Sequence, residues 1–146
     1  MGLLSLVLNI LWILTGGLWM ALGWLIAALL MVITIIGIPW AGAAFNIAGY
    51  TLLPFGRVAL RRDEVEGRET IGTGPLGTLG NIIWLVLAGW WLALGHVITA
   101  LALALTIIGL PFAWAHFKLA GLSLWPIGQV IVSADEADRL QARTRV

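Results

Sequence analysis

Two long apolar stretches constrain the fold of this chain most strongly. Residues 3–56 and 76–132 contain one formally charged side chain between them, that of Lys118. A membrane-spanning helix needs about 20 apolar residues, so each stretch is long enough for two membrane segments. Only 10% of the residues are charged, whereas soluble domains have about 25%. We therefore expect an integral membrane protein and exclude a free soluble domain and a disordered chain.

Several chemical functions are not expected. The net charge of +1 provides no basic surface for nucleic acid. The chain has no cysteine, and His96 and His116 alone do not make a metal site. The apolar stretches carry no carboxylate pair, and no nucleophile or phosphate-binding motif is present. The sequence therefore predicts neither an enzyme nor a bound cofactor or metal.

The chain contains an internal duplication. Residues 9–60 align without gaps on residues 81–132 at an offset of 72, and 25 of the 52 aligned pairs are identical. The shared positions include Gly, Pro, Trp and Asn, as in TIIGIP and TIIGLP, which chance matches between apolar sequences do not explain. We predict membrane repeats at 1–60 and 81–132, a hydrophilic linker at 61–80 and a tail at 133–146.

The charged residues predict the topology. The linker region carries four arginines and the tail three, namely Arg57, Arg61, Arg62 and Arg68, and Arg139, Arg143 and Arg145. Arginine in short loops favours the cytoplasmic side of the membrane. Both regions and both termini are therefore expected on that side, with the repeats parallel and related by an axis along the membrane normal.

Each repeat is expected to contain a long helix and a short one. Proline favours a break before it and the first turn of a new helix. The breaks at Gly37–Pro39 and at its equivalent predict helices at about 3–36, 40–53, 77–107 and 112–125. The fold class is thus an all-α membrane protein with about four membrane helices. Either the long helix tilts or kinks near Gly16–Gly17, or the short helices are re-entrant or lie at the interface, and the sequence leaves both alternatives open.

A few residues stand out as functional or packing candidates. Polar groups in a membrane mark either helix contacts or a pathway, and here they are Asn9, Asn81, Thr34, Thr106 and Lys118. The structural alternatives are interhelical hydrogen bonds for the asparagines, bonds to turn carbonyls for the threonines, and a lysine that reaches the headgroups. Small residues four apart let helices approach closely, and the duplicated pairs are Gly17/Ala21, Gly37/Ala41, Gly89/Ala93 and Gly109/Ala113.

The motif N-I-[LI]-W, followed by T-I-I-G-[IL]-P and P-x-G, occurs twice on either side of a charged linker. This pattern resembles the YccF family of bacterial inner-membrane proteins, over about residues 9–132. The resemblance implies a bacterial inner-membrane protein built from two inner-membrane component repeats. It implies no catalytic or binding residues.

Three hypotheses for the function remain open at this point. The favoured one is a homo-oligomeric channel or pore for ions or small solutes, because four short segments do not easily enclose a pathway alone. The alternative is a non-conducting scaffold or accessory subunit that binds a protein partner through its linker or tail. A dimeric transporter would place Asn9, Asn81 or Lys118 in a cavity at the membrane midplane. Lipid is a partner in all three hypotheses.

Overall fold

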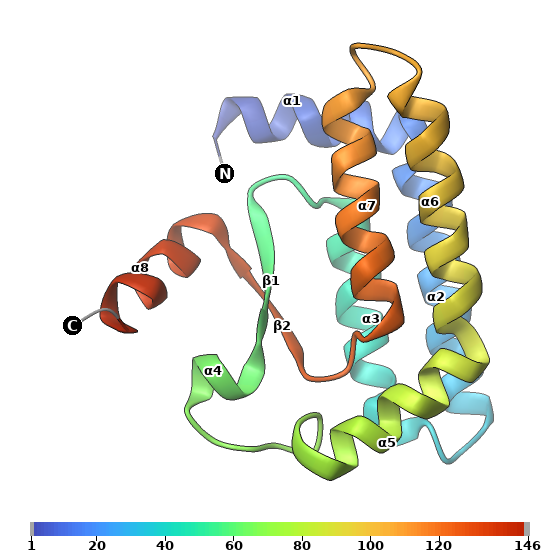
Figure 1. Ribbon diagram of the computed structural model, residues 1–146, viewed down its shortest axis with the longest axis vertical. Coiled ribbons are helices and arrows are strands. Elements are labelled where there is room, and N and C mark those ends of the chain that lie inside the picture. Colours follow the sequence, from blue (N-terminus) through green and yellow to red (C-terminus); the bar gives the residue numbers. More distant parts are fainter. Residues whose placement is uncertain (1, 145–146) are drawn as a thin grey trace.

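The computed structural model describes residues 2–144 and is mainly helical (Figure 1). The first repeat contains α1 (Leu3–Trp12), a π-helical segment (Ile13–Gly17), α2 (Leu18–Ile33), α3 (Ile38–Leu52) and β1 (Arg57–Arg61). The short helix α4 (Arg62–Glu66) follows. The second repeat contains α5 (Gly74–Trp84), a π-helical segment (Leu85–Gly89), α6 (Trp90–Ala104), α7 (Leu110–Leu124) and β2 (Gln129–Ser133), and α8 (Ala134–Thr144) follows it.

A π-helical segment bends the long helix of each repeat. Leu3–Ile33 and Gly74–Ala104 are each continuous over 31 residues and apolar enough to cross a membrane. In the first, Gly16 has a φ of 131°, which explains the bend expected near Gly16–Gly17. Figure 1 shows α1 lying across the end of α2, and α5 at an angle to α6.

The bend also separates the faces of two tryptophans. Trp12 and Trp19 are seven residues apart and would share one face of a straight helix. Here Trp12 is fully buried, whereas Trp19 is 74% exposed. The extra residue of the π-helical segment rotates the two halves of the helix relative to one another.

A two-stranded antiparallel sheet, which the all-α prediction did not include, joins the ends of the two repeats. Ala59 pairs with Ile131 at its centre, and these positions are equivalent in the duplication. At its two ends the N–H of Arg62 donates to the Gly128 carbonyl (2.8 Å), and the N–H of Ala134 donates to the Gly56 carbonyl (3.1 Å). These two bonds are also equivalent, so a pseudo-twofold axis passes through the centre of the sheet.

The same symmetry relates the helices. Trp24 donates to His96, its equivalent, with 3.3 Å between Nε1 and Nε2. A Cβ added at Gly23 would lie nearest to the Leu92 side chain, and one added at Gly95 would lie nearest to the Met20 side chain. These two contacts are equivalent in the duplication. Met20 of α2 contacts Gly95 of α6, whereas Gly23, further along α2, contacts Leu92, which comes earlier in α6. The two helices therefore run antiparallel across the axis. In Figure 1 the α2–α3 and α6–α7 turns accordingly lie at opposite ends of the molecule.

The predicted domain boundaries shift in the structure. β1 lies at the end of the first repeat, and α5 begins at Gly74, inside the predicted linker 61–80. The tail 133–146 forms α8 as far as Thr144. The side chain of Arg143 and all of Arg145 lie outside the part of the molecule that is described.

The core is aromatic and the outer surface is apolar. Trp12, Trp24 and Trp84 are fully buried, and Trp24 stacks on Trp84 with 5.1 Å between ring centroids. The outer faces of the helices expose large apolar side chains, and so do the two turns: Ile35 74%, Ile36 69%, Ile107 88% and Ile108 81%. A surface of this kind is suited to lipid.

Candidate functional site

The two duplicated asparagines bind backbone at the entrances to the sheet. The Asn9 side chain donates to the Phe55 carbonyl and accepts from the Phe55 N–H, both at 3.0 Å. Asn81 makes the equivalent pair with Ile127, at 2.9 and 3.0 Å, and also donates to the Gly77 carbonyl at 3.1 Å. Each amide thus pairs with a peptide group as a neighbouring strand would. This holds the P-x-G turn against α1 or α5.

The tryptophans three residues later tie the bent helices to their neighbours. Trp12 Nε1 donates to the Thr51 carbonyl and Trp84 Nε1 to the Ser123 carbonyl, both at 2.7 Å. Each indole occupies the space beside a glycine: a Cβ at Gly17 would collide with the Trp12 ring, and one at Gly89 would lie 2.9 Å from the Ser123 oxygen. These glycines therefore make room for a ring or a backbone group.

Thr34 and Thr106 lie at the helix turns. Their hydroxyls donate to the carbonyls of Met31 (2.8 Å) and Leu103 (3.0 Å), three residues earlier. A Cβ at Gly37 or Gly109 would meet the backbone of the same two residues. The threonines and glycines together close each turn. Thr34 also borders an apolar cavity of about 350 Å³ next to Ile82 and Val86.

The four candidate packing alanines are all buried within the chain: Ala21, Ala41, Ala93 and Ala113. The helices that carry them, α2 with α3 and α6 with α7, make the two most extensive helix contacts. The alanines of these small-residue pairs are therefore buried within the chain and not exposed on its outer surface. Gly37 and Gly109 serve the turns instead of a helix interface.

The structure brings together two histidines that no sequence pattern had paired. His96 and His116 are fully buried, with 2.9 Å between their Nδ1 atoms. Because an indole N–H can only donate, His96 Nε2 accepts from Trp24, and its Nδ1–H then donates to His116. His116 Nε2 is left without a hydrogen-bond partner among the described residues. The offset of 72 is a signal for the Trp24–His96 contact, whose residues are equivalents in the duplication, but not for the contact between the two histidines.

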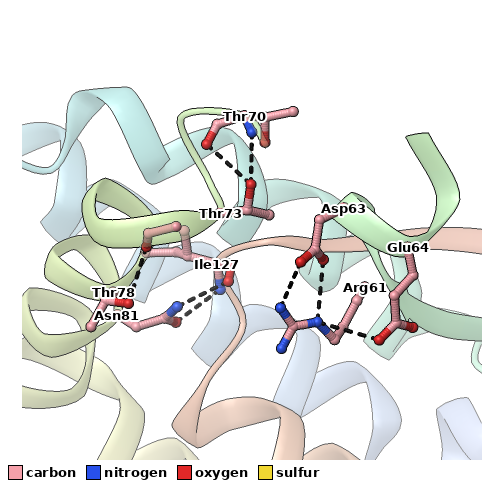
Figure 2. A network of polar contacts seen from close by, with 9 residues as sticks. Arg61, Asp63, Glu64, Thr70, Thr73, Thr78, Asn81 and Ile127 are labelled. Atoms are coloured by element: carbon pink, nitrogen blue, oxygen red, sulfur yellow. Dashed lines mark hydrogen bonds and ion pairs between the residues drawn. The ribbon is translucent and has the colours of Figure 1, made fainter. Parts of the chain in front are cut away.

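The hydrophilic side of the molecule holds its own charge network (Figure 2). Arg61 contacts Asp63 (2.7 Å) and Glu64 (3.5 Å), and Arg62 contacts Glu66 (3.3 Å). The hydrogen bonds from Arg61 hold the pKa of the Asp63 carboxyl below its usual range. Figure 2 shows this network beside Asn81, and Arg61, Asp63 and Asn81 all line a cavity of about 330 Å³.

Lys118 lies on the exposed side of α7, two residues from buried His116. Its ammonium lies 5.6 Å from the centre of the Trp114 ring. Both side chains border a larger cavity of about 560 Å³ beside β1. The structure thus places the candidate polar residues at separate locations and does not bring them together around one pathway.

Comparison with known proteins agrees with this duplicated architecture. The model of the inner membrane component domain, YccF, matches twice, at residues 7–57 and 79–129. The chain belongs to the YccF family. It is 40% identical over 134 residues to the inner membrane protein YccF of Escherichia coli (strain K12), which covers 90% of this chain and 89% of that protein. The protein of the same name from Shigella flexneri matches to the same extent.

Membership of the YccF family agrees with a bacterial inner-membrane location, because the relatives carry that description. No solved structure matches this chain. In the part of the YccF-family chain that is described, no three His, Cys, Asp or Glu side chains cluster as a metal site would require. The geometry of the chain itself must therefore carry any proposal about its function.

Proposed function

We propose that this YccF-family protein is a non-conducting scaffold embedded in the inner membrane from its cytoplasmic side. The observation that carries the proposal is that α2 and α6 run antiparallel about the axis that also passes through the sheet. The orientation of this axis decides which elements lie in lipid.

An axis in the membrane plane would make the helices cross the membrane. It would also place the centre of the sheet at mid-depth, with the charged residues of β1 and α4 near it. A charged side chain at the bilayer centre costs at least about 2.5 kcal/mol by insertion scales. An axis along the membrane normal keeps the sheet, α4 and α8 together on one side of the membrane. The four main helices are then tilted far from the membrane normal and lie within the bilayer.

Helix lengths support the second orientation. The bends divide the long helices, so the straight pieces α2 and α6 have 16 and 15 residues. At 1.5 Å per residue these pieces span about 24 Å or less, short of a hydrocarbon core of about 30 Å. If the helices crossed, the two turns would emerge on opposite sides of the membrane, and their exposed isoleucines would lie in water. In the tilted placement they stay in lipid.

A protein placed in this way presents its hydrophilic side to the cytoplasm. That side consists of the sheet, α4 and α8, and the first turn of α8 carries Asp135 and Glu136. The duplicated Asn, Trp and Thr side chains bind the chain's own backbone, so they stabilise the fold and offer no polar pathway. We therefore favour recruitment of a protein partner by this surface, without enzymatic activity.

Cysteine accessibility tests the placement, and the chain has no native cysteine to interfere. We expect single cysteines at Ile36 and Ile108 to resist a membrane-impermeant maleimide from both sides of the membrane. A cysteine at Glu69, in the linker, should react in inside-out vesicles only. Labelling of one turn in intact spheroplasts and of the other in inside-out vesicles would show that the repeats cross the membrane and would overturn the one-sided placement.

A homo-oligomeric channel or pore for ions or small solutes is the second candidate. It is favoured by the outer face of α3, where a Cβ at Gly42 or Gly49 would meet nothing within 4 Å. Small residues seven apart on an exposed helix face allow a second chain to approach closely. In this arrangement the helices cross, and the pathway forms between chains.

Mass and flux measurements separate the two candidates. The scaffold predicts a monomer or dimer in mild detergent and no ion flux through reconstituted liposomes. A ring of four or more chains with measurable conductance would support the pore and contradict the scaffold. Gly49→Leu should then abolish both the ring and the flux, whereas Gly2→Leu, outside the helices, should leave both unchanged.

A further inference from the structure

A cavity of about 560 Å³ lies beside β1, between the first half of α7 and the turn that links α3 to β1. Two positively charged side chains line it, Arg57 from β1 and Lys118 from α7. Tyr50 and Trp114 line it as well, so the cavity combines cations with aromatic rings at the junction of the apolar helices and the hydrophilic side.

The two cations of this cavity have no acidic partner among the residues that the structure describes. The other linker arginines, Arg61, Arg62 and Arg68, form ion pairs with acids of α4. Within the described part of the chain, neither Arg57 nor Lys118 forms an ion pair, and no acidic residue lines the cavity. The cavity therefore concentrates positive charge that the protein itself does not neutralise.

The duplication supplies an internal comparison. The equivalent cavity of the first repeat is lined by Asn46 and Gln129, at the positions of Lys118 and Arg57, and the cation that lines it, Arg62, forms an ion pair with Glu66. It is smaller, about 270 Å³, and the linker segment Thr70–Gly72 borders it. There the Trp40 ring nitrogen donates to the Ile71 carbonyl at 3.0 Å. The linker thus occupies in one repeat the space that remains open, and positively charged, in the other.

We propose that the open cavity binds the phosphate headgroup of an anionic membrane lipid. Arg57 and Lys118 supply charge-assisted hydrogen bonds to the phosphate, and Trp114 and Tyr50 lie at the level where aromatic rings border the headgroups. The exposed apolar faces of the helices beside the cavity accommodate the acyl chains. This inference rests on the placement proposed above, because it requires the hydrophilic side to meet the membrane surface, and the cysteine labelling of the turns tests that placement separately.

The wild-type chain allows a test without substitution, because Lys118 is its only lysine. The protein in phosphatidylcholine nanodiscs is acetylated with an amine reagent, and modification of Lys118 is measured by mass spectrometry. We expect phosphatidylglycerol in the nanodisc to slow this modification by about fivefold or more, because a lipid phosphate bound to Lys118 protects its amine and one cation–phosphate contact has an effect of this size. Inorganic phosphate in phosphatidylcholine nanodiscs forms the second arm and should give little protection.

Substitutions give an independent readout. Phosphatidylglycerol binding to the detergent-solubilised protein is measured from bound fractions in native mass spectra. Arg57→Gln and Lys118→Gln should each weaken binding by about fivefold, and Lys118→Arg should retain it. Arg61→Gln also removes one positive charge from the hydrophilic side, but outside this cavity. It should leave phosphatidylglycerol binding within about twofold of that of the wild-type protein.

Each unfavourable outcome has a distinct meaning. Equal weakening by Arg61→Gln would show general attraction to the protein surface and overturn the site. Equal protection by inorganic phosphate would overturn the lipid in favour of a free anion. Absence of any protection of Lys118 by phosphatidylglycerol in the wild-type protein would overturn the proposal whatever the variants do.

Discussion

Replacing Trp84 with alanine is expected to lower the free energy of unfolding by about 4 kcal/mol. The fully buried ring stacks on Trp24, and its Nε1 bonds to the Ser123 carbonyl at 2.7 Å. The substitution removes the ring, opens a cavity at the junction of α5, α6 and α7, and leaves that carbonyl without its donor. Unfolding of the detergent-solubilised protein by sodium dodecyl sulfate measures the loss.

Trp90 provides the matched control for this substitution. It begins α6, only six residues from Trp84, but it is 57% exposed. Trp90→Ala should cost less than about 1 kcal/mol, because an exposed ring leaves no cavity. Trp84→Phe should recover part of the loss, since it keeps most of the packing but not the hydrogen bond. Similar costs for Trp84→Ala and Trp90→Ala would contradict the role assigned to the buried ring.

Replacing Asn81 with leucine should cost about 3 kcal/mol of unfolding free energy. Leucine has a similar volume, but it leaves the N–H and carbonyl of Ile127 without their partners in a buried place. An unsatisfied buried polar group costs about 1–3 kcal/mol. The same unfolding measurement applies, and Asn9→Leu should also be destabilising because Asn9 makes the equivalent pair with Phe55.

Thr78 is the control for Asn81. It lies one helix turn earlier on α5, is exposed, and bonds only to the Gly74 carbonyl of its own helix. Thr78→Val should change stability by less than about 0.5 kcal/mol. If Asn81→Leu were as mild as Thr78→Val, the asparagine would not hold the entrance to the sheet, and its duplication would need another explanation.

The two repeats differ at a position where the axis brings them together. Trp24 contacts its own equivalent, His96, and His116 stands where the first repeat has Ala44. A residue at a twofold axis contacts its own equivalent, so two tryptophans there would present two N–H donors and no acceptor. A tryptophan that donates to a histidine resolves this, and it explains why both histidines occur only in the second repeat.

Much of the architecture could be predicted from the sequence. The duplication at an offset of 72, the breaks at the two TIIG motifs, and the bend near Gly16–Gly17 are all visible in residue identity, because glycine and proline act locally on the backbone. The sheet was missed because its strands are short and lie 72 residues apart, and a five-residue strand has no stability until its partner is present.

Among the polar residues, too, the local hydrogen bonds could be predicted from the sequence and the long-range ones could not. Their duplication marked Asn9, Asn81, Thr34 and Thr106 as important, and the threonine bonds are local enough to be expected from spacing. The partners of the asparagines and of Trp12 and Trp84 lie 46 and 39 residues away in sequence. Contacts of that range depend on how the helices pack, which no local pattern encodes.

By itself, the sequence determined that this chain is a membrane protein of two similar halves with its charges collected in two segments. Composition and repetition are enough for that conclusion, because burying charge in lipid is costly and a duplicated sequence folds twice in the same way. Only the tertiary structure decided how the halves meet: antiparallel helices and an antiparallel sheet about one axis. That relation arises from packing between distant residues, and it left one of two equivalent cavities open and positively charged.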